Sequence, residues 1–408
     1  MAEAARNPGP AAARPAAAGA PETSRVAFID NLRWLVIGMV VVMHACVTYS
    51  GLGSWYYKEP SALGAPSLLV FSVYQSFAQA FFMGLLFLIS AYFIPRAYDR
   101  KGFCRFVRDR LFRLGVPTLV YMLILNPLIA LVMAAFKGQT LTAAAVGAQY
   151  ARYIGSFQFL SGTGPLWFAF ALLVFSILYA VVRVIADAVQ GPARKEARTL
   201  RKPTVLTHGK VLAVIFLIAL VAFLVRIVQP IGTSVLNMQL SFFTQYVVLF
   251  LIGLWTARAD VLRTLPTGFG MSWLRLAFAV GVRAWFLLGG LGGALTGSMD
   301  TFGGGLHWQA AGYALWESFF CVAFSIGLIT LYRERMNAPS RVTCFLSTSA
   351  FGVYVFHAPI LVGISMALHR FTAAPLAKAA LVSVIALAAS VVCAALVRTV
   401  PGLRRVFA

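Results

Sequence analysis

The sequence predicts an all-α membrane protein, a polytopic bundle of about ten transmembrane helices. Of the 408 residues, 60% are hydrophobic and only 11% are charged, a composition that soluble domains of this length do not show. Apolar segments long enough to cross a bilayer, which takes about 20 residues, recur along the chain. The expected spans cover residues 31–50, 68–94, 115–136, 165–187, 209–228, 239–257, 272–294, 309–331, 346–368 and 377–398.

The segments outside these spans are expected to be short. Residues 1–24 are rich in alanine and proline and contain no apolar run, which predicts a disordered cytoplasmic tail. Residues 401–408 form a second short cytoplasmic tail, so one membrane domain covers residues 25–400. The stretch 141–158 is partly apolar but is interrupted by polar residues and a glycine. It is expected to lie on the surface or to re-enter the membrane without crossing it.

The distribution of basic residues predicts the orientation. On a ten-span topology, 27 of the 34 lysines and arginines fall on one side of the membrane and five fall on the other. The side richer in basic residues is normally cytoplasmic, so both termini are expected in the cytoplasm. Topology and contacts with anionic lipid head groups then explain the net charge of +22, and nucleic-acid binding is not expected.

Cysteines and histidines give no sign of a metal or cofactor site. The five cysteines form no CxxC pair, and the five histidines show no metal-ligand spacing. We therefore expect no bound metal or cofactor.

The first expected span carries the first candidate site. Arg33 and His44 are eleven residues apart, so on a helix they lie on nearly the same face and about 16 Å apart along the axis. Asp30 can form an ion pair with Arg33 at the cytoplasmic rim. An ionisable residue inside a span is costly and indicates function, and an imidazole is suited to act as a general base on a hydroxyl. The alternative is a rim ion pair and a histidine that only bonds a neighbouring helix.

Four more ionisable residues of the expected spans are candidate site residues: Arg226, Arg283, Glu317 and His357. Each would be costly facing lipid, so each is expected to face the bundle interior or a wet cavity. Glu317 either belongs to a site or forms a structural ion pair with Arg283 or Arg226. His357 either takes part in a site or bonds a carbonyl that Pro359 leaves free.

Two further motifs lie near the cytoplasmic ends of expected spans. Arg110 and Arg113 are one helical turn apart just before the third span, where they either anchor that span or bind phosphate through their planar guanidinium groups. Ser90 and Ala91, near the end of the second span, are small and would permit close helix packing.

Together, these motifs resemble the acyltransferase-3 family of integral-membrane O-acyltransferases, in the family's order and over roughly residues 25–398. The resemblance rests on Asp30-x-x-Arg33 with His44, on Phe81-Phe82…Phe87-x-Ile89-Ser90, on Arg110-x-x-Arg113…Pro117, on Leu166-Trp167-Phe168 and on Ser349…Tyr354-x-x-His357-x-Pro359. Ala91 stands where the family usually has glycine. Within the family, the Asp30-x-x-Arg33 start, Tyr49-Ser50, Trp55 and Phe81-Phe82 are most similar to the branch that succinylates osmoregulated periplasmic glucans.

The resemblance implies an enzyme of the bacterial inner membrane that moves an acyl group, of the acetyl or succinyl type, from cytoplasmic acyl-CoA to a hydroxyl of a glycan or lipid-linked sugar on the outer side. The expected catalytic residues are His44 and Glu317, with Glu317 orienting or charge-balancing the imidazole if the two meet. The CoA phosphates are expected at the cytoplasmic rim, with the pantetheine arm running toward His44. The expected substrate-binding residues are Asp30, Arg33, Ser90, Arg110, Arg113, Trp167, Arg283 and His357.

A transporter or flippase for a glycolipid or an organic anion is the alternative function. The intramembrane charges would serve transport equally well. The absence of an internal repeat among the ten segments, and of a matching pair of broken helices, weighs against it.

Overall fold

The computed structural model describes residues 26–59, 62–190, 205–294 and 299–407, and in these ranges the chain forms helices and no strand. Ten helical segments of the described chain are long and apolar enough to cross a membrane, as the sequence predicts. The expected tail 1–24 lies outside the described residues. Those ten segments are α1 (Ala27–Ser50), α2 (Ala65–Tyr92), the run from α3 (Ile94–Arg110) to α5 (Asn126–Phe136), α7 (Trp167–Gln190), α9 (His208–Val228), α10 (Phe243–Ala259), the run from α12 (Thr267–Leu276) to α13 (Arg283–Leu291), α15 (Trp308–Arg335), α16 (Arg341–Ala367) and α17 (Pro375–Val397).

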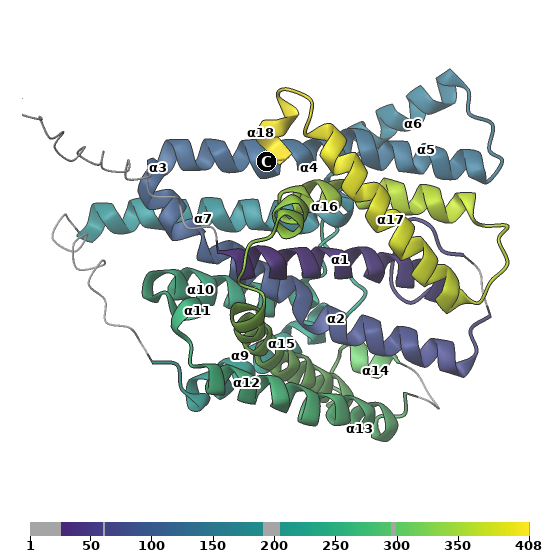
Figure 1. Ribbon diagram of the computed structural model, residues 1–408. Coiled ribbons are helices and arrows are strands. Elements are labelled where there is room, and N and C mark those ends of the chain that lie inside the picture. Colours follow the sequence, from purple (N-terminus) through teal and green to yellow (C-terminus); the bar gives the residue numbers. More distant parts are fainter. Residues whose placement is uncertain (1–25, 60–61, 191–204, 295–298, 408) are drawn as a thin grey trace, which may run out of the picture.

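Helix α1 is the centre of the bundle (Figure 1). It contacts α2, α15, α16 and α17, and apolar side chains on almost every side of it are buried. A helix that is apolar all round is suited to such a central position. On one side of this core α3 packs against α7, and on the other α9 and α12 pack against α15. Most residues of α1 are therefore enclosed by protein.

The end of α1 directs the chain back over the bundle. Gly51 has a φ of +71° and donates its backbone N–H to the Val47 carbonyl at 3.0 Å. This left-handed helix end favours glycine, which has no Cβ to clash. The loop that follows returns across the end of α1, where it reaches His44.

The basic segment after α2 differs from the expected loop. It forms helix α3, which is kinked at Gly102 (φ +69°). Beyond the kink the chain continues through a π-helical turn, α4 (Val116–Val120) and a second π-helical turn into α5. Lysine and arginine are good helix formers, so both parts of α3 are helical although they are too polar to lie in lipid. The stretch 141–158 contains α6 (Ala143–Gly155), which at 13 residues is too short to span a bilayer.

Three short helices complete the described chain. They are α11 (Val261–Thr264), α14 (Asp300–Gly303) and α18 (Leu403–Phe407). Helix α18 falls in the expected C-terminal tail, where Phe407 is buried and packs against Phe351 and Phe356 of α16.

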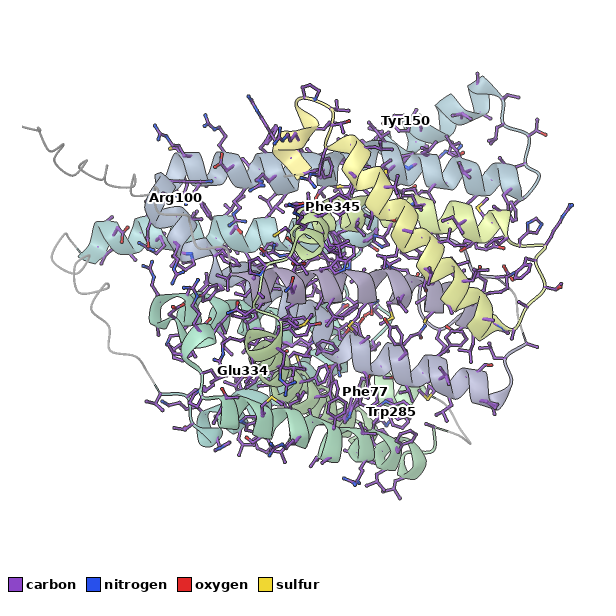
Figure 2. All side chains as sticks on the ribbon, in the orientation of Figure 1. Phe77, Arg100, Tyr150, Trp285, Glu334 and Phe345 are labelled. Carbon is purple, nitrogen blue, oxygen red and sulfur yellow. The ribbon has the colours of Figure 1, made fainter. Side chains whose placement is uncertain are left out.

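Small side chains bring α10 close to α2. A Cβ placed on Gly253 of α10 would lie 2.3 Å from the Leu88 carbonyl oxygen and 2.7 Å from the Ala91 Cβ. Close approach of this kind is a usual way for membrane helices to associate. Larger side chains fill other parts of the bundle, for example where Phe77 of α2 meets Trp285 of α13 (Figure 2).

Replacing Gly253 should destabilise the bundle, because no side chain fits between α10 and the backbone of α2. We expect Gly253→Leu to cost about 1–3 kcal/mol or more and to lower the thermal unfolding midpoint in detergent. Gly363→Leu is the matched control, since a Cβ there meets no atom within 4 Å. Equal midpoints for the two variants would contradict the packing described here.

Candidate active site

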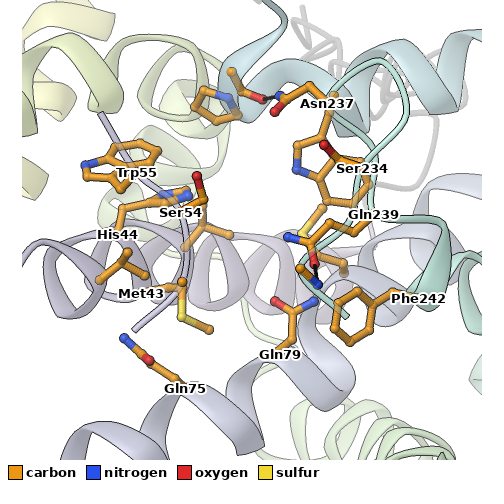
Figure 3. A pocket seen from close by; sticks show the side chains of 18 of the residues that line it. Met43, His44, Ser54, Trp55, Gln75, Gln79, Ser234, Asn237, Gln239 and Phe242 are labelled. Carbon is orange, nitrogen blue, oxygen red and sulfur yellow. Dashed lines mark hydrogen bonds between the residues drawn. The ribbon is translucent and has the colours of Figure 1, made fainter. Parts of the chain in front are cut away.

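A cavity of about 620 Å³ lies at the end of the bundle where α1 finishes. Its walls come from α1, the loop 51–59, α2, the start of α7 and the loop 229–242, with contributions from α15 and α16 (Figure 3). His44 and Trp167, two of the expected site residues, line it. The cavity extends along α1 only as far as Val40.

His44 is enclosed by two aromatic rings. The indole of Trp55 stacks on its imidazole, with 3.9 Å between ring centroids and 17° between planes. The second ring is that of His357 on α16, and its Nε2 lies 3.1 Å from the Nδ1 of His44. His357 is itself fully buried. The structure thus brings together two histidines that are 313 residues apart in the sequence.

The hydrogen bonds define which nitrogen of His44 is basic. The Nδ1 of His357 lies 2.8 Å from the Tyr354 carbonyl oxygen. Because a carbonyl oxygen can only accept a hydrogen bond, the Nδ1 of His357 carries the ring proton. In a neutral ring the Nε2 of His357 is then an acceptor, and the Nδ1 of His44 must donate to it. The lone pair of His44 is therefore on Nε2, the nitrogen not used in this pair.

The rest of the cavity is polar without being charged. None of its lining residues is a lysine, arginine, aspartate or glutamate. Amides, hydroxyls and aromatic rings take their place and match a ligand rich in hydroxyl groups. Besides His44, the polar and aromatic lining residues are Ser54, Trp55, Tyr56, Gln75, Ser76, Gln79, Phe82, Asn126, Ser161, Trp167, Ser234, Asn237, Gln239, Phe242, Tyr246, Tyr313 and Tyr354.

The loop that carries Trp55 is fixed at two points. Its far end is held by a buried ion pair in which Lys378 of α17 donates to Glu59 at 2.5 Å. Closer to Trp55, the Tyr56 hydroxyl donates to the Asn126 side chain at 2.7 Å. Burial raises the pKa of Tyr56 to about 12, so this donor stays protonated. Sequence reasoning missed the Glu59–Lys378 pair, because its partners are 319 residues apart and neither lies in a motif.

A second loop closes the cavity from the opposite side. The Asn237 side chain donates to the Thr163 hydroxyl at 3.0 Å and to the Gly164 carbonyl at 2.8 Å. The next carbonyl in this turn, that of Pro165, accepts from the Tyr354 hydroxyl. The carbonyl of Tyr354 is hydrogen-bonded to His357. Tyr354 therefore contacts both the cavity wall, through its hydroxyl, and the histidine pair, through its carbonyl.

Glu317 lies behind the cavity wall and its ion-pair partner is Arg226. Both side chains are buried, and the Arg226 guanidinium lies over the rings of Phe242 and Tyr313, which line the cavity. The structural ion pair considered from the sequence therefore forms. The ring and hydrogen-bond partners described for the His44 imidazole are Trp55, His357 and the Val40 backbone, so the Arg226–Glu317 pair supports the wall and does not touch the imidazole.

The expected donor-binding residues lie away from the cavity. Arg33 pairs with Asp30 at 3.1 Å, as its spacing predicts. Between Arg33 and the cavity the same face of α1 is packed, with Ile37 and Val41 buried. Arg110 packs its guanidinium on Phe106, whereas Arg113 and Ser90 are exposed and half-buried, respectively.

Arg283 does not face the bundle interior, so that expectation is wrong. Its side chain is exposed, and its Nη1 donates to the Ala279 carbonyl at 2.6 Å. Ala279 belongs to a π-helical turn, residues 277–282, whose altered hydrogen bonding leaves carbonyls open to such a donor. A backbone carbonyl thus accepts the hydrogen bond at this exposed guanidinium.

The buried Glu59–Lys378 pair should be strongly coupled. Lys378→Met leaves an unpaired carboxylate that is largely buried, and we expect a loss of up to about 3 kcal/mol of stability. The double variant Glu59→Leu/Lys378→Met should lose less than the sum of the single variants. The exposed Lys101–Asp109 pair is the control, where breaking the pair should cost about 0–1 kcal/mol. Thermal unfolding in detergent measures all variants, and strict additivity at Glu59–Lys378 would refute the coupling.

Among the comparisons with known proteins, one gives a match. No curated protein and no solved structure matches the chain. Residues 26–397, nearly the whole chain, match the family model of the acyltransferase-3 group, which is described as an acyltransferase domain. The protein is therefore a member of the acyltransferase-3 family and a multi-pass membrane acyltransferase.

Proposed function

We propose that the protein transfers an acyl group, of the acetyl or succinyl type, from cytoplasmic acyl-CoA to a hydroxyl of an uncharged sugar on the outer side of a bacterial inner membrane. In this orientation both termini are cytoplasmic, as the basic residues favour. The observation that carries the proposal is the position of His44, whose basic Nε2 belongs to a residue lining a neutral, polar and aromatic cavity.

The cavity lining supports a sugar as the acceptor. Its amides and hydroxyls can both donate and accept hydrogen bonds, as sugar hydroxyls do, and its aromatic rings offer apolar faces for a sugar ring. An organic anion, the alternative cargo of a transporter, would be expected to meet a cation, and no lysine or arginine lines this cavity. A glucan or a lipid-linked sugar fits the same description.

The proposed reaction uses one proton acceptor. His44 Nε2 takes the proton of the acceptor hydroxyl while the oxygen attacks the thioester carbonyl of the donor. The carbon–sulfur bond then breaks, and the CoA thiolate takes the proton from the imidazolium. His357 accepts the Nδ1–H of His44 throughout and so keeps Nε2 available.

The donor is proposed to bind with its phosphates near Arg33, Arg110 and Arg113. Arginine suits phosphate because its planar guanidinium makes two hydrogen bonds at once. Ile37 and Val41 fill the space between Arg33 and the cavity, so the pantetheine arm must displace these side chains or pass beside them. Acyl transfer across the membrane therefore requires a local opening of α1 toward its neighbours.

Variants at the two histidines separate catalysis from positioning. We expect His44→Ala to lower kcat by about 10²–10⁴-fold, the usual contribution of a general base. His357→Leu removes the acceptor for His44 Nδ1 and should lower kcat with little change in KM for the acceptor. His357→Gln, whose amide oxygen can accept, should recover part of the loss. Release of CoA from acetyl-CoA or succinyl-CoA with a mixed glycan extract measures the rates, and wild-type kcat in His357→Leu would contradict the positioning role.

The donor site is tested at Arg33. We expect Arg33→Ala to raise the KM for acyl-CoA at least tenfold, because one charged phosphate contact is lost. Arg275→Ala, at an exposed arginine of α12, is the control and should keep the wild-type KM. If folded Arg33→Ala binds acyl-CoA as tightly as the control, the donor phosphates bind elsewhere.

A further inference from the structure

A second cavity lies on the face of α1 that points away from His44. It measures about 440 Å³, and its walls include Trp34, Gly38 and Val42 of α1, Tyr74 of α2 and Leu387 of α17. The two residues from Val42 to His44 turn the helix by about 200°, so the two cavities lie on opposite faces. We call this second cavity the Gly38 groove.

The space beside Gly38 is open. A Cβ placed on this glycine would meet no atom within 4 Å, so close packing does not require the missing side chain. Glycine inside a helix lowers stability by about 1 kcal/mol relative to alanine. At Gly38 the missing side chain leaves space next to α1. The side chains of Trp34, Met39 and Leu387 around this space are only half-buried, as expected for a groove that opens to its surroundings.

The length and lining of the groove match one acyl chain. It follows α1 from Asn31 to Val42, which is about 16 Å at 1.5 Å per residue. One leaflet of a bilayer provides about half of the 30 Å hydrocarbon core, a similar length. Leucine, methionine, valine and aromatic side chains dominate the walls. At this depth of a membrane span, the matching occupant is a hydrocarbon chain.

Two arginines are close in sequence to residues that line the end of the groove near Asn31. The Asn31 side chain donates to the Met336 carbonyl at 2.7 Å and joins α1 to the end of α15 there. Arg335 precedes Met336, and Arg341 is two residues before Thr343, which also lines the groove; both arginines are exposed. The neighbouring carboxylate, Glu334, is already paired with Arg333. Positive charge at this level favours an anionic head group.

We propose that the Gly38 groove binds one anionic phospholipid, with an acyl chain beside Gly38 and the head group at Arg335 and Arg341. The assignment does not depend on the proposed reaction, because this groove and the His44 cavity share no lining residue.

The test is native mass spectrometry of the delipidated full-length protein, titrated with phosphatidylglycerol or phosphatidylcholine. We expect wild type to bind one phosphatidylglycerol at least tenfold more tightly than phosphatidylcholine. Gly38→Phe fills the groove and should abolish this tight site, with Gly38→Leu as a smaller replacement that should weaken it. The matched control, Gly363→Phe, adds the same ring at an open glycine on α16 and should bind as wild type does. Arg335→Gln/Arg341→Gln should remove the preference for the anionic lipid and keep the groove.

Three results would overturn the assignment. The first is wild-type affinity in both Gly38 variants while their thermal unfolding remains cooperative. The second is equal affinity of wild type for the two lipids. The third is displacement of phosphatidylglycerol from wild type by equimolar palmitoyl-CoA, since the groove would then be a donor site. None of these three results depends on CoA release by the His44 variants, which tests the proposed function separately.

Discussion

The hydrogen bond between His44 and His357 is the interaction on which the account of the site depends. It forms at the contact of α1 with α16, where His357 is fully buried. A lone imidazole in such a place would leave one polar nitrogen unsatisfied, which is costly. Two imidazoles and the Tyr354 carbonyl satisfy one another in series, and one nitrogen of His44 is left over. The hydrogen bonds that compensate for burying the two imidazoles therefore also leave the Nε2 of His44 available as a base.

The remaining polar groups are arranged so that the cavity stays uncharged. The Arg226–Glu317 pair lies behind the aromatic wall, the Glu59–Lys378 pair fixes the loop beside it, and Arg33 lies at the other end of α1. A buried ion pair is not in itself a strong source of stability. Here each pair ties together segments that are far apart in the sequence, and one segment of each pair, α15 or the loop 51–59, lines the cavity.

The sequence predicts the fold well and the site in part. Hydrophobic segments give the ten spans, because a bilayer imposes a minimum length and a low charge on each. The Asp30–Arg33 pair and the position of His44 follow from helical spacing within one segment. The partners of His44 and of Glu317 do not follow, since spacing carries no information about which helices touch. Arg283 shows the same limit: a charge inside a span predicts an enclosed side chain, but a π-helical turn supplies a carbonyl at the surface.

The most direct measurement of the central claim is the tautomeric state of His44. The protein would be labelled with ¹⁵N-histidine and measured by solid-state nuclear magnetic resonance in lipid at neutral pH, and the His44→Gln and His357→Gln variants would assign the signals among the five histidines. The account predicts a protonated Nδ1 and an unprotonated Nε2 for His44, and the same for His357. A protonated Nε2 on His44 would contradict it, because that nitrogen could not then accept the proton of a hydroxyl.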